Sequence, residues 1–161
     1  MIYVTVGTMF MDFPRLINAM DEIARTSDEE VIVQTGMAPT KPEYASHFDF
    51  RDREEVQSIQ SRARMIVCHA GIGALQDALA ARRPIAIVPR LKQHREHMND
   101  HQLDLARAVE ARGWGRMVID VAELADLCTS PPPAPTDYRP ASTTLINAIH
   151  DDIAYLTGAP T

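Results

Sequence analysis

The sequence lacks the features of a membrane-spanning, secreted or nucleic-acid-binding chain. No apolar run approaches the ~18 residues that cross a bilayer as a helix. The N-terminal residues MIYVTVGT carry neither a basic region nor a long apolar region, so we expect no signal peptide. Basic residues do not cluster in runs, and the net charge of −6 argues against a nucleic-acid surface. We therefore expect a cytoplasmic chain with no nucleic-acid partner.

Cysteine is scarce as well, which bears on the redox compartment. The only two cysteines are Cys68 and Cys128, and neither belongs to a CxxC pair. Cys68 lies in an apolar segment, where an unpaired cysteine behaves as a small hydrophobic residue. A disulfide is therefore not expected, and this pattern fits a reducing cytoplasm.

What the sequence does contain is a regular alternation of strand-like and helix-like segments. Apolar or β-branched runs predict strands at residues 2–6, 31–33, 47–50, 65–68, 84–88 and 116–119. Apolar spacing or helix-forming composition predicts helices at residues 14–25, 53–62, 74–81, 97–112 and 121–128. This alternation predicts an α/β fold, a Rossmann-like parallel sheet with helices on both faces. The 161 residues are expected to form a single domain, with a Pro-rich connection at 129–140 and a last helix at 142–157.

Residues 65–102 contain the strongest functional pattern. A short apolar strand leads into the small-residue turn His69–Gly73, and a helix follows. Glycines allow the backbone to approach a phosphate, and the N–H groups of a helix's first turn point at it. The next strand, 84–88, leads into a polar loop. Because ligands bind at the carboxyl ends of strands in open parallel sheets, we expect the site at this edge.

Single motifs in this stretch are weak on their own. The dinucleotide fingerprint GxGxxG is incomplete because Gln76 occupies its last glycine position, which disfavours nicotinamide cofactors. Asp77 lies one turn into the helix, where its carboxylate suits a ribose diol and the helix dipole equally well. Gly7 and Thr8 follow the first strand, and a glycine there either approaches a phosphate or, more simply, allows a turn.

In combination, these motifs resemble the glycosyltransferase family 28 C-terminal domain, and more narrowly its short Alg13-like and PssE-like subunits. The pairing of HAG with HQ at this spacing is more specific than any single piece, and the resemblance extends to about Gly113. It rests on VTVGT at 4–8, QTG at 34–36, HAGIGALQDAL at 69–79, RPIAIVPR at 83–90 and EHMNDHQLDLA at 96–106.

The resemblance implies the donor-binding, C-terminal half of a GT-B glycosyltransferase that takes a UDP-sugar as its substrate and uses no cofactor or metal. In that family the glycine turn approaches the diphosphate, the residue matching Asp77 contacts the ribose, and the residue matching Gln102 contacts the donor sugar. The expected nucleotide-binding residues are Gly7, Thr8, His69, Ala70, Gly71, Gly73 and Asp77. Those expected at the donor sugar are Arg90, Asn99 and Gln102.

The implied reaction is inverting transfer of glucuronic acid or N-acetylglucosamine to a polyprenyl-diphosphate-linked acceptor. The sequence has no room for the acceptor-binding domain, so the resemblance implies a membrane-anchored Alg14-like or PssD-like partner that recruits this chain to the inner face of the membrane. His69 is a candidate general base, although the partner is an equal source of that group. A candidate docking stripe, which ordinary core packing explains as well, consists of Leu145, Ile146, Ile149, Ile153 and Leu156.

Two residues depart from the family pattern and keep other functions open. Ala74 replaces the usual Thr, and Asp77 replaces the usual Glu, which gives weight to a UDP-responsive regulatory subunit without turnover. A third hypothesis is a zinc-dependent hydrolase. If their segment is helical, three histidines share a face with spacing suited to zinc, namely His94, His97 and His101.

Overall fold

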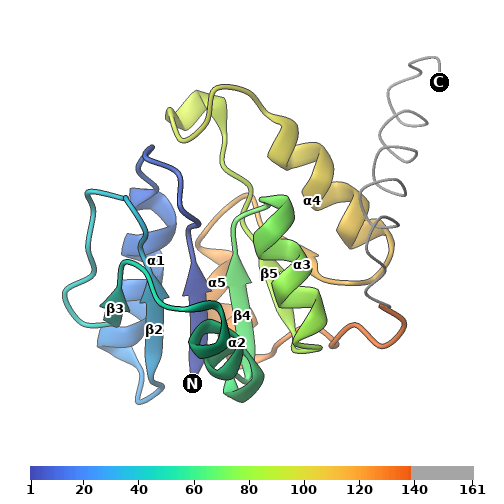
Figure 1. Ribbon diagram of the computed structural model, residues 1–161, viewed down its shortest axis with the longest axis horizontal. Helices are drawn as coiled ribbons and strands as arrows, with labels where there is room; N and C mark the ends of the chain where they lie inside the picture. Colours follow the sequence, from blue (N-terminus) through green and yellow to red (C-terminus); the bar gives the residue numbers. More distant parts are fainter. Residues whose placement is uncertain (139–161) are drawn as a thin grey trace.

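The computed structural model describes residues 1–138 and contains a six-stranded sheet whose neighbouring strands are all parallel (Figure 1). The order across the sheet is β3-β2-β1-β4-β5-β6. The expected Rossmann-like α/β fold is therefore confirmed. The strands are β1 (Ile2–Thr5), β2 (Val31–Gln34), β3 (Ser46–Phe48), β4 (Met65–Cys68), β5 (Ile85–Ile87) and β6 (Arg116–Met117).

Helices cover both faces of this sheet (Figure 1). One face packs against α1 and α5, and the other packs against α2, α3 and α4. None of the helices between residues 1 and 138 combines the length and apolar character needed to cross a bilayer. Their bounds are α1 (Pro14–Thr26), α2 (Arg53–Arg62), α3 (Ile72–Ala80), α4 (His101–Ala111) and α5 (Glu123–Thr129), with a short 3-10 turn η1 (Lys92–His94).

Alternation of side chains along the strands produces two hydrophobic cores. In β1, Ile2 and Val4 join the core beneath α1 and α5, whereas Tyr3 joins the core beneath α2, α3 and α4. Both faces are buried, which explains why the strands appear in the sequence as continuous apolar runs. Cys68 and Cys128 are both buried and unpaired.

The strand order places a crevice beside the central strands. From β1 the chain proceeds outward through β2 to β3, and it then returns to the other side of β1 to form β4 and β5. The connections that leave β1 and β4 therefore diverge to opposite sides of the sheet. Such a switch point opens a crevice at the carboxyl ends of the two strands.

The helix predicted from residue 97 begins instead at His101. The backbone of Arg95 is left-handed, with φ of 59°, and this conformation interrupts helical geometry. Glu96 turns inward, and the Oδ1 atom of Asn99 accepts the N–H of His101 at 3.3 Å. The predicted helix at 142–157 and the end of the 129–140 connection lie outside the described residues.

An ion pair ties the amino-terminal edge of the sheet together. The guanidinium of Arg64, just before β4, donates two hydrogen bonds to the carboxylate of Glu29, just before β2. It also donates to the carbonyl oxygen of Cys128 in α5 at 2.7 Å. The hydrogen bonds from Arg64 lower the pKa of Glu29 to about 2.

We expect Glu29→Gln to destabilise the protein by about 1 kcal/mol at neutral pH, because the pair is partly exposed to solvent. The folded-state pKa of Glu29 lies below its ordinary value of 4.5, so the stabilisation exists above that value and is lost as pH falls toward about 2. Urea unfolding of both proteins across this range measures the effect. The two curves should converge in acid, while the exposed Glu43→Gln should track the parent throughout. A gap that persists in acid would contradict the assignment.

Candidate functional site

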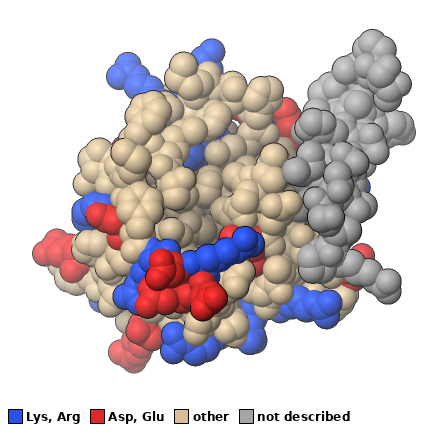
Figure 2. Space-filling model, in the orientation of Figure 1, with Lys and Arg blue, Asp and Glu red and all other residues tan. Residues whose placement is uncertain are grey.

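An open cavity of about 390 Å³ lies at the carboxyl edge of the sheet, in the crevice between β1 and β4. Its walls come from the ends of β1, β2 and β4 and from helices α2 and α3. The face of the molecule drawn in Figure 2 is hollowed near its centre. The predicted nucleotide-binding residues that line the cavity are Gly7, Thr8, His69, Gly71, Gly73 and Asp77.

The imidazole of His69 fills the space between two of the glycines. A Cβ atom at Gly7 would lie 2.5 Å from Cε1 of this ring, and one at Gly71 would lie 2.3 Å from its Nε2. Real Cβ atoms do not approach so closely, and Gly7 also has a left-handed φ of 79°. The packing of His69 is therefore sufficient reason for glycine at both positions, independently of any phosphate.

His69 is a neutral group in this setting. Burial lowers its pKa to about 4, and the charge of Arg90 acts in the same direction. Its Nδ1 atom is buried and has no hydrogen-bond partner among residues 1–138. A neutral imidazole adds no positive charge to the cavity. With so low a pKa it is also a weak acceptor of protons at neutral pH, which bears on the general-base role predicted for it.

The start of α3 provides the open anion site. Gly73 lies in the first turn, and a Cβ atom at this position would meet nothing within 4 Å. No side chain caps the helix, and Gly73 and Ala74 both line the cavity. Uncapped N–H groups at the positive end of the helix dipole attract a phosphate. The N–H of Ala70, which was also expected to bind nucleotide, donates instead to Oε1 of Gln102 at 3.1 Å.

An ion pair spans the two helical walls of the cavity. The Nη2 atom of Arg53, at the start of α2, donates to Oδ1 of Asp77 in α3 at 3.1 Å. Arg51 lines the same wall. Nothing in the sequence singles out these two arginines, because arginines around the start of a charged helix are normally solvated. Only the sheet order, which brings α2 beside α3, assigns them to the cavity.

The floor of the cavity is fixed by Gln34 at the end of β2. Its Oε1 accepts hydrogen bonds from the hydroxyl groups of Tyr3 at 2.7 Å and Thr5 at 3.0 Å. The hydroxyl of Thr5 in turn accepts the N–H of Gly7 at 3.2 Å. Gln34 belongs to the QTG motif, so the sequence contained its signal, but its position depends on the pairing of β1 with β2.

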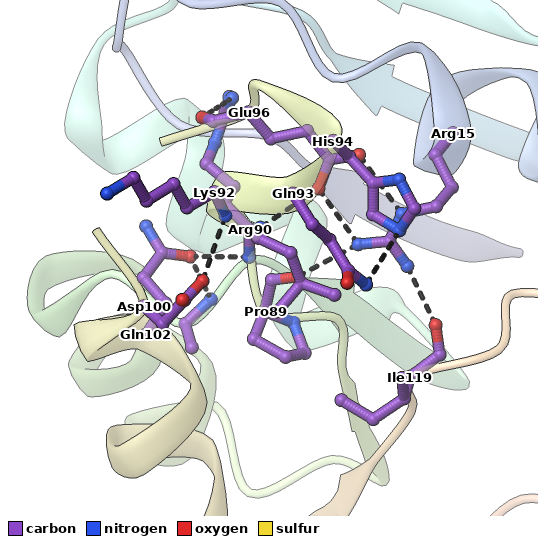
Figure 3. Close-up of polar contacts among 12 residues, drawn as sticks. Arg15, Pro89, Arg90, Lys92, Gln93, His94, Glu96, Asp100, Gln102 and Ile119 are labelled. Carbon is purple, nitrogen blue, oxygen red and sulfur yellow. Dashed lines mark hydrogen bonds and ion pairs between the residues drawn. The ribbon is translucent and has the colours of Figure 1, made fainter. Parts of the chain in front are cut away.

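Arg90, which follows β5, is buried beneath the neighbouring loops (Figure 3). Its guanidinium lies 4.6 Å from the ring centroid of Phe13. Burial lowers its pKa to about 10, so the group remains charged at neutral pH. Its Nη1 and Nη2 atoms donate within the loops, and its buried Nε has no hydrogen-bond partner among residues 1–138. Arg90 does not line the cavity, and its contact with a donor sugar stays a prediction. The carbonyl oxygens that accept from Arg90 are those of Val6 (2.7 Å), Met11 (2.9 Å), Asp12 (3.0 Å) and Glu96 (3.2 Å).

Glu96 extends this network to α1. Its carboxylate is 2% exposed and accepts hydrogen bonds from Nε and Nη2 of Arg15 at 3.0 and 2.9 Å (Figure 3). The same carboxylate accepts the N–H of Leu91 at 3.1 Å. Arg15 also donates to the carbonyl oxygens of Pro89 and Ile119. The loop after β5 is thus bonded to α1 and to the segment after β6.

Gln102 joins the carboxyl ends of β4 and β5. Its Oε1 atom accepts the N–H of Ala70, after β4, and the N–H of Arg90, after β5, both at 3.1 Å. Its side chain is 8% exposed. The Oδ1 atom of Asn99 accepts the N–H of His101 at the start of α4. Neither Asn99 nor Gln102 lines the cavity, and their contact with a donor sugar stays a prediction.

The three histidines proposed for zinc do not share a helix face. His94 lies in η1, His97 lies in the bend that follows, and His101 begins α4. Within the part of the chain that the structure describes, no group of three or more His, Cys, Asp or Glu side chains is arranged to hold a metal ion. The helical premise of the zinc hypothesis is therefore wrong.

We expect Arg90→Met to lower the free energy of unfolding by about 3 kcal/mol, because it strips buried carbonyl groups of their donors. Arg90→Lys should fall between the parent and Arg90→Met, since an ammonium keeps the charge but not the planar fork. The exposed Arg62→Met should stay within about 0.5 kcal/mol of the parent. Urea unfolding of the four proteins tests this ranking, and equal stability of Arg90→Met and Arg62→Met would disprove it.

Comparison with known proteins agrees with this architecture. Residues 1–131 match the family described as the glycosyltransferase family 28 C-terminal domain. The human UDP-N-acetylglucosamine transferase subunit ALG13 is 28% identical over 121 residues, which is 70% of this chain. The chain spans only 10% of the length of that relative.

Solved structures share the fold at low sequence identity. The solution structure of ALG13 superposes with a TM-score of 0.62 at 15% identity, and the match covers 94% of this chain and 96% of that one. The calicheamicin glycosyltransferase CalG4 gives 0.61 at 16% identity, with 94% of this chain matched to 37% of the enzyme. The Streptomyces glycosyltransferase SsfS6, complexed with thymidine diphosphate, gives 0.53 at 22% identity, with 99% matched to 41%. The match over residues 1–131, on a sheet of this topology, establishes that the chain belongs to the glycosyltransferase family 28 C-terminal domain family.

Proposed function

We propose that this chain is the donor-binding subunit of a two-component inverting glycosyltransferase. It takes a UDP-sugar and, with a membrane-anchored partner, transfers the sugar to a polyprenyl-diphosphate-linked acceptor. The observation that carries the proposal is the cavity at the switch point, where the uncapped start of α3 and the unobstructed Gly73 form an anion site. Family membership supports the same assignment.

The cavity suits a nucleoside diphosphate in shape and in charge. The diphosphate lies against the first turn of α3, one turn away from Asp77, whose carboxylate accepts the ribose hydroxyl groups. Because His69 is neutral, the positive potential at the diphosphate comes from backbone N–H groups, the helix dipole and the two arginines of the cavity wall, Arg51 and Arg53. These fixed groups stabilise the negative charge that develops on UDP as the sugar departs.

The donor sugar is N-acetylglucosamine in this proposal, with glucuronic acid as the alternative. The relative that matches 70% of the chain is named as a UDP-N-acetylglucosamine transferase subunit. The buried position of Arg90 removes one cation that would otherwise pair with the carboxylate of glucuronic acid.

A partner subunit supplies the acceptor side. The match covers 37% of CalG4 and 41% of SsfS6, which is less than half of either enzyme. Transfer also requires a base that removes a proton from the acceptor hydroxyl, and a group with a pKa of about 4, such as His69, does this poorly at neutral pH. We therefore assign the general base to the partner. A UDP-responsive regulatory subunit without turnover is the second candidate, because Asp77 is engaged by Arg53.

We expect Gly73→Ala to weaken UDP binding about tenfold while leaving the protein at least as stable as the parent. The added methyl group enters the open space that a phosphate would occupy, and the loss of one charge-assisted hydrogen bond corresponds to about 1.5 kcal/mol. Alanine is also the better helix former. Titration calorimetry with UDP and ADP, alongside thermal unfolding, measures both effects.

Ala80→Ser, in the last turn of the same helix and outside the cavity, is the control and should bind UDP as the parent does. The parent should prefer UDP to ADP. Absent binding, or equal binding of the two nucleotides, would remove the basis of the proposed function.

We expect radiolabelled sugar to pass from UDP-N-acetylglucosamine to lipid only when the chain is mixed with membranes that contain its partner. UDP-glucuronic acid serves as the competing donor, and the Gly73→Ala protein serves as the negative control. Transfer by the isolated chain would contradict the assignment of the acceptor site and base to a partner. Binding of UDP without transfer under any combination would favour the regulatory alternative.

A further inference from the structure

One part of the cavity lies beneath α2 and takes no part in the anion site. The helix connects β3 to β4 and so crosses over β2 and β1, beside α3 on the same face of the sheet (Figure 1). Arg53, Val56 and Gln60 line the cavity, and their spacing of three and four residues places them on one face of α2. We call the part of the cavity lined by Thr5, Gln34, Val56 and Gln60 its amide end.

Gln60 is a buried residue whose amide has no partner. It is 3% exposed, and its side chain forms no hydrogen bond within residues 1–138. Even so, its amide is not among the fully enclosed polar atoms that lack a partner there, which are Nδ1 of His69 and Nε of Arg90. The amide therefore opens into the cavity that the residue lines. Burial of an amide without a partner is unfavourable, and a ligand that hydrogen-bonds it removes this penalty.

Gln34 presents a second amide to the cavity, in a fixed orientation. The hydroxyl of Thr5 accepts the N–H of Gly7, which leaves its own proton for Oε1 of Gln34. The hydroxyl of Tyr3 donates to the same oxygen. The amide oxygen is thus occupied, whereas the Nε2 group has no partner within residues 1–138. Gln34 therefore offers only N–H donors to a ligand.

The groups that line the cavity follow the order of the groups in a nucleotide. The open anion site is at Gly73, and Asp77 lies one turn further along α3. Asp77 is bonded to Arg53 in the first turn of α2. One and two turns beyond Arg53 are Val56, which offers apolar contact to the face of a ring, and Gln60, which offers a donor and an acceptor to its edge. A diphosphate, a ribose and a base succeed one another in the same way.

We propose that the amide end binds the nucleobase of the donor and that Gln60 recognises it. The imide edge of uracil presents an N–H group between two carbonyl oxygens. The amide of Gln60 accepts this N–H and donates to one carbonyl, as side-chain amides pair with other base edges. The fixed N–H groups of Gln34 favour a base that carries carbonyl oxygens. This inference rests on the proposed function and adds to it the residue that recognises the base.

Titration calorimetry with UDP, its N3-methyl derivative and inorganic pyrophosphate tests the proposal. The N3-methyl derivative lacks the imide proton, and pyrophosphate lacks the whole nucleoside. The parent should bind the N3-methyl derivative at least about tenfold more weakly than UDP, because a bidentate hydrogen-bonded pair is lost. Gln60→Leu should bind UDP about tenfold more weakly than the parent does, and should no longer distinguish UDP from the N3-methyl derivative. Its binding of pyrophosphate should equal that of the parent.

Thermal unfolding separates recognition of a ligand from a structural role of Gln60. Leucine replaces a buried amide that has no partner, so Gln60→Leu should be at least as stable as the parent. A glutamine required by the fold would instead give a less stable variant. Gln57→Leu is the matched control, because Gln57 is exposed on the same helix and does not line the cavity. It should bind all three compounds as the parent does.

Gly73→Ala distinguishes failure of this inference from failure of the proposed function. The variant should weaken binding of both UDP and pyrophosphate, because its methyl group enters the anion site. A parent that binds neither compound would remove the proposed function and this inference with it. If the parent binds UDP but Gln60→Leu binds it as well as Gln57→Leu does, the inference alone is overturned. Equal losses of UDP and pyrophosphate binding in Gln60→Leu would also overturn it.

Discussion

The buried guanidinium of Arg90 is the interaction on which the carboxyl edge of this protein depends. A charge removed from water is costly unless hydrogen bonds replace its hydration, and here four backbone carbonyl groups do so. Those carbonyls belong to the loops after β1 and β5, so the charge holds the two loops together. Gln102 and Glu96 continue the network to the ends of β4 and α1. The loop after β1, which lines the cavity at Gly7 and Thr8, is thus bonded to the loop after β5.

The charge of the groups that line the cavity determines which chemistry it supports. A neutral His69 packed between Gly7 and Gly71 shapes the crevice without contributing charge. The attraction for an anion then comes from Arg51 and Arg53 in the cavity wall and from the backbone N–H groups at the start of α3, which are already oriented before a ligand arrives. In the proposed function, this arrangement holds a nucleoside diphosphate and stabilises it as a leaving group, while another group accepts the proton. The low pKa of His69 is the reason for which the proposal assigns the general base to a partner subunit.

The strands and their order of succession were predictable because β-branched runs and helical periodicity are local signals. The family motifs also located the cavity, since Gly7, His69, Gly73 and Asp77 line it. Arg90 was not predictable from its neighbours: an arginine in a polar loop is normally solvated, and only the three-dimensional convergence of carbonyl groups explains its burial. The position of Arg51 and Arg53 at the cavity was not predictable either, because α2 forms a wall of the cavity only through the strand order. The start of α4 was placed too early because the inward turn of Glu96 is a tertiary effect.

The three glycines of the crevice have different physical surroundings. Gly7 and Gly71 are demanded by the ring of His69, so a lineage selected only to fold would retain them. A Cβ atom at Gly73 would contact no neighbour, so packing does not require glycine there. Alanine at this helical position would be more stable than glycine. Neutral drift would replace it early. Retention of Gly73 in related sequences would therefore indicate selection for ligand binding, whereas retention of Gly7 and Gly71 would indicate only selection for the fold.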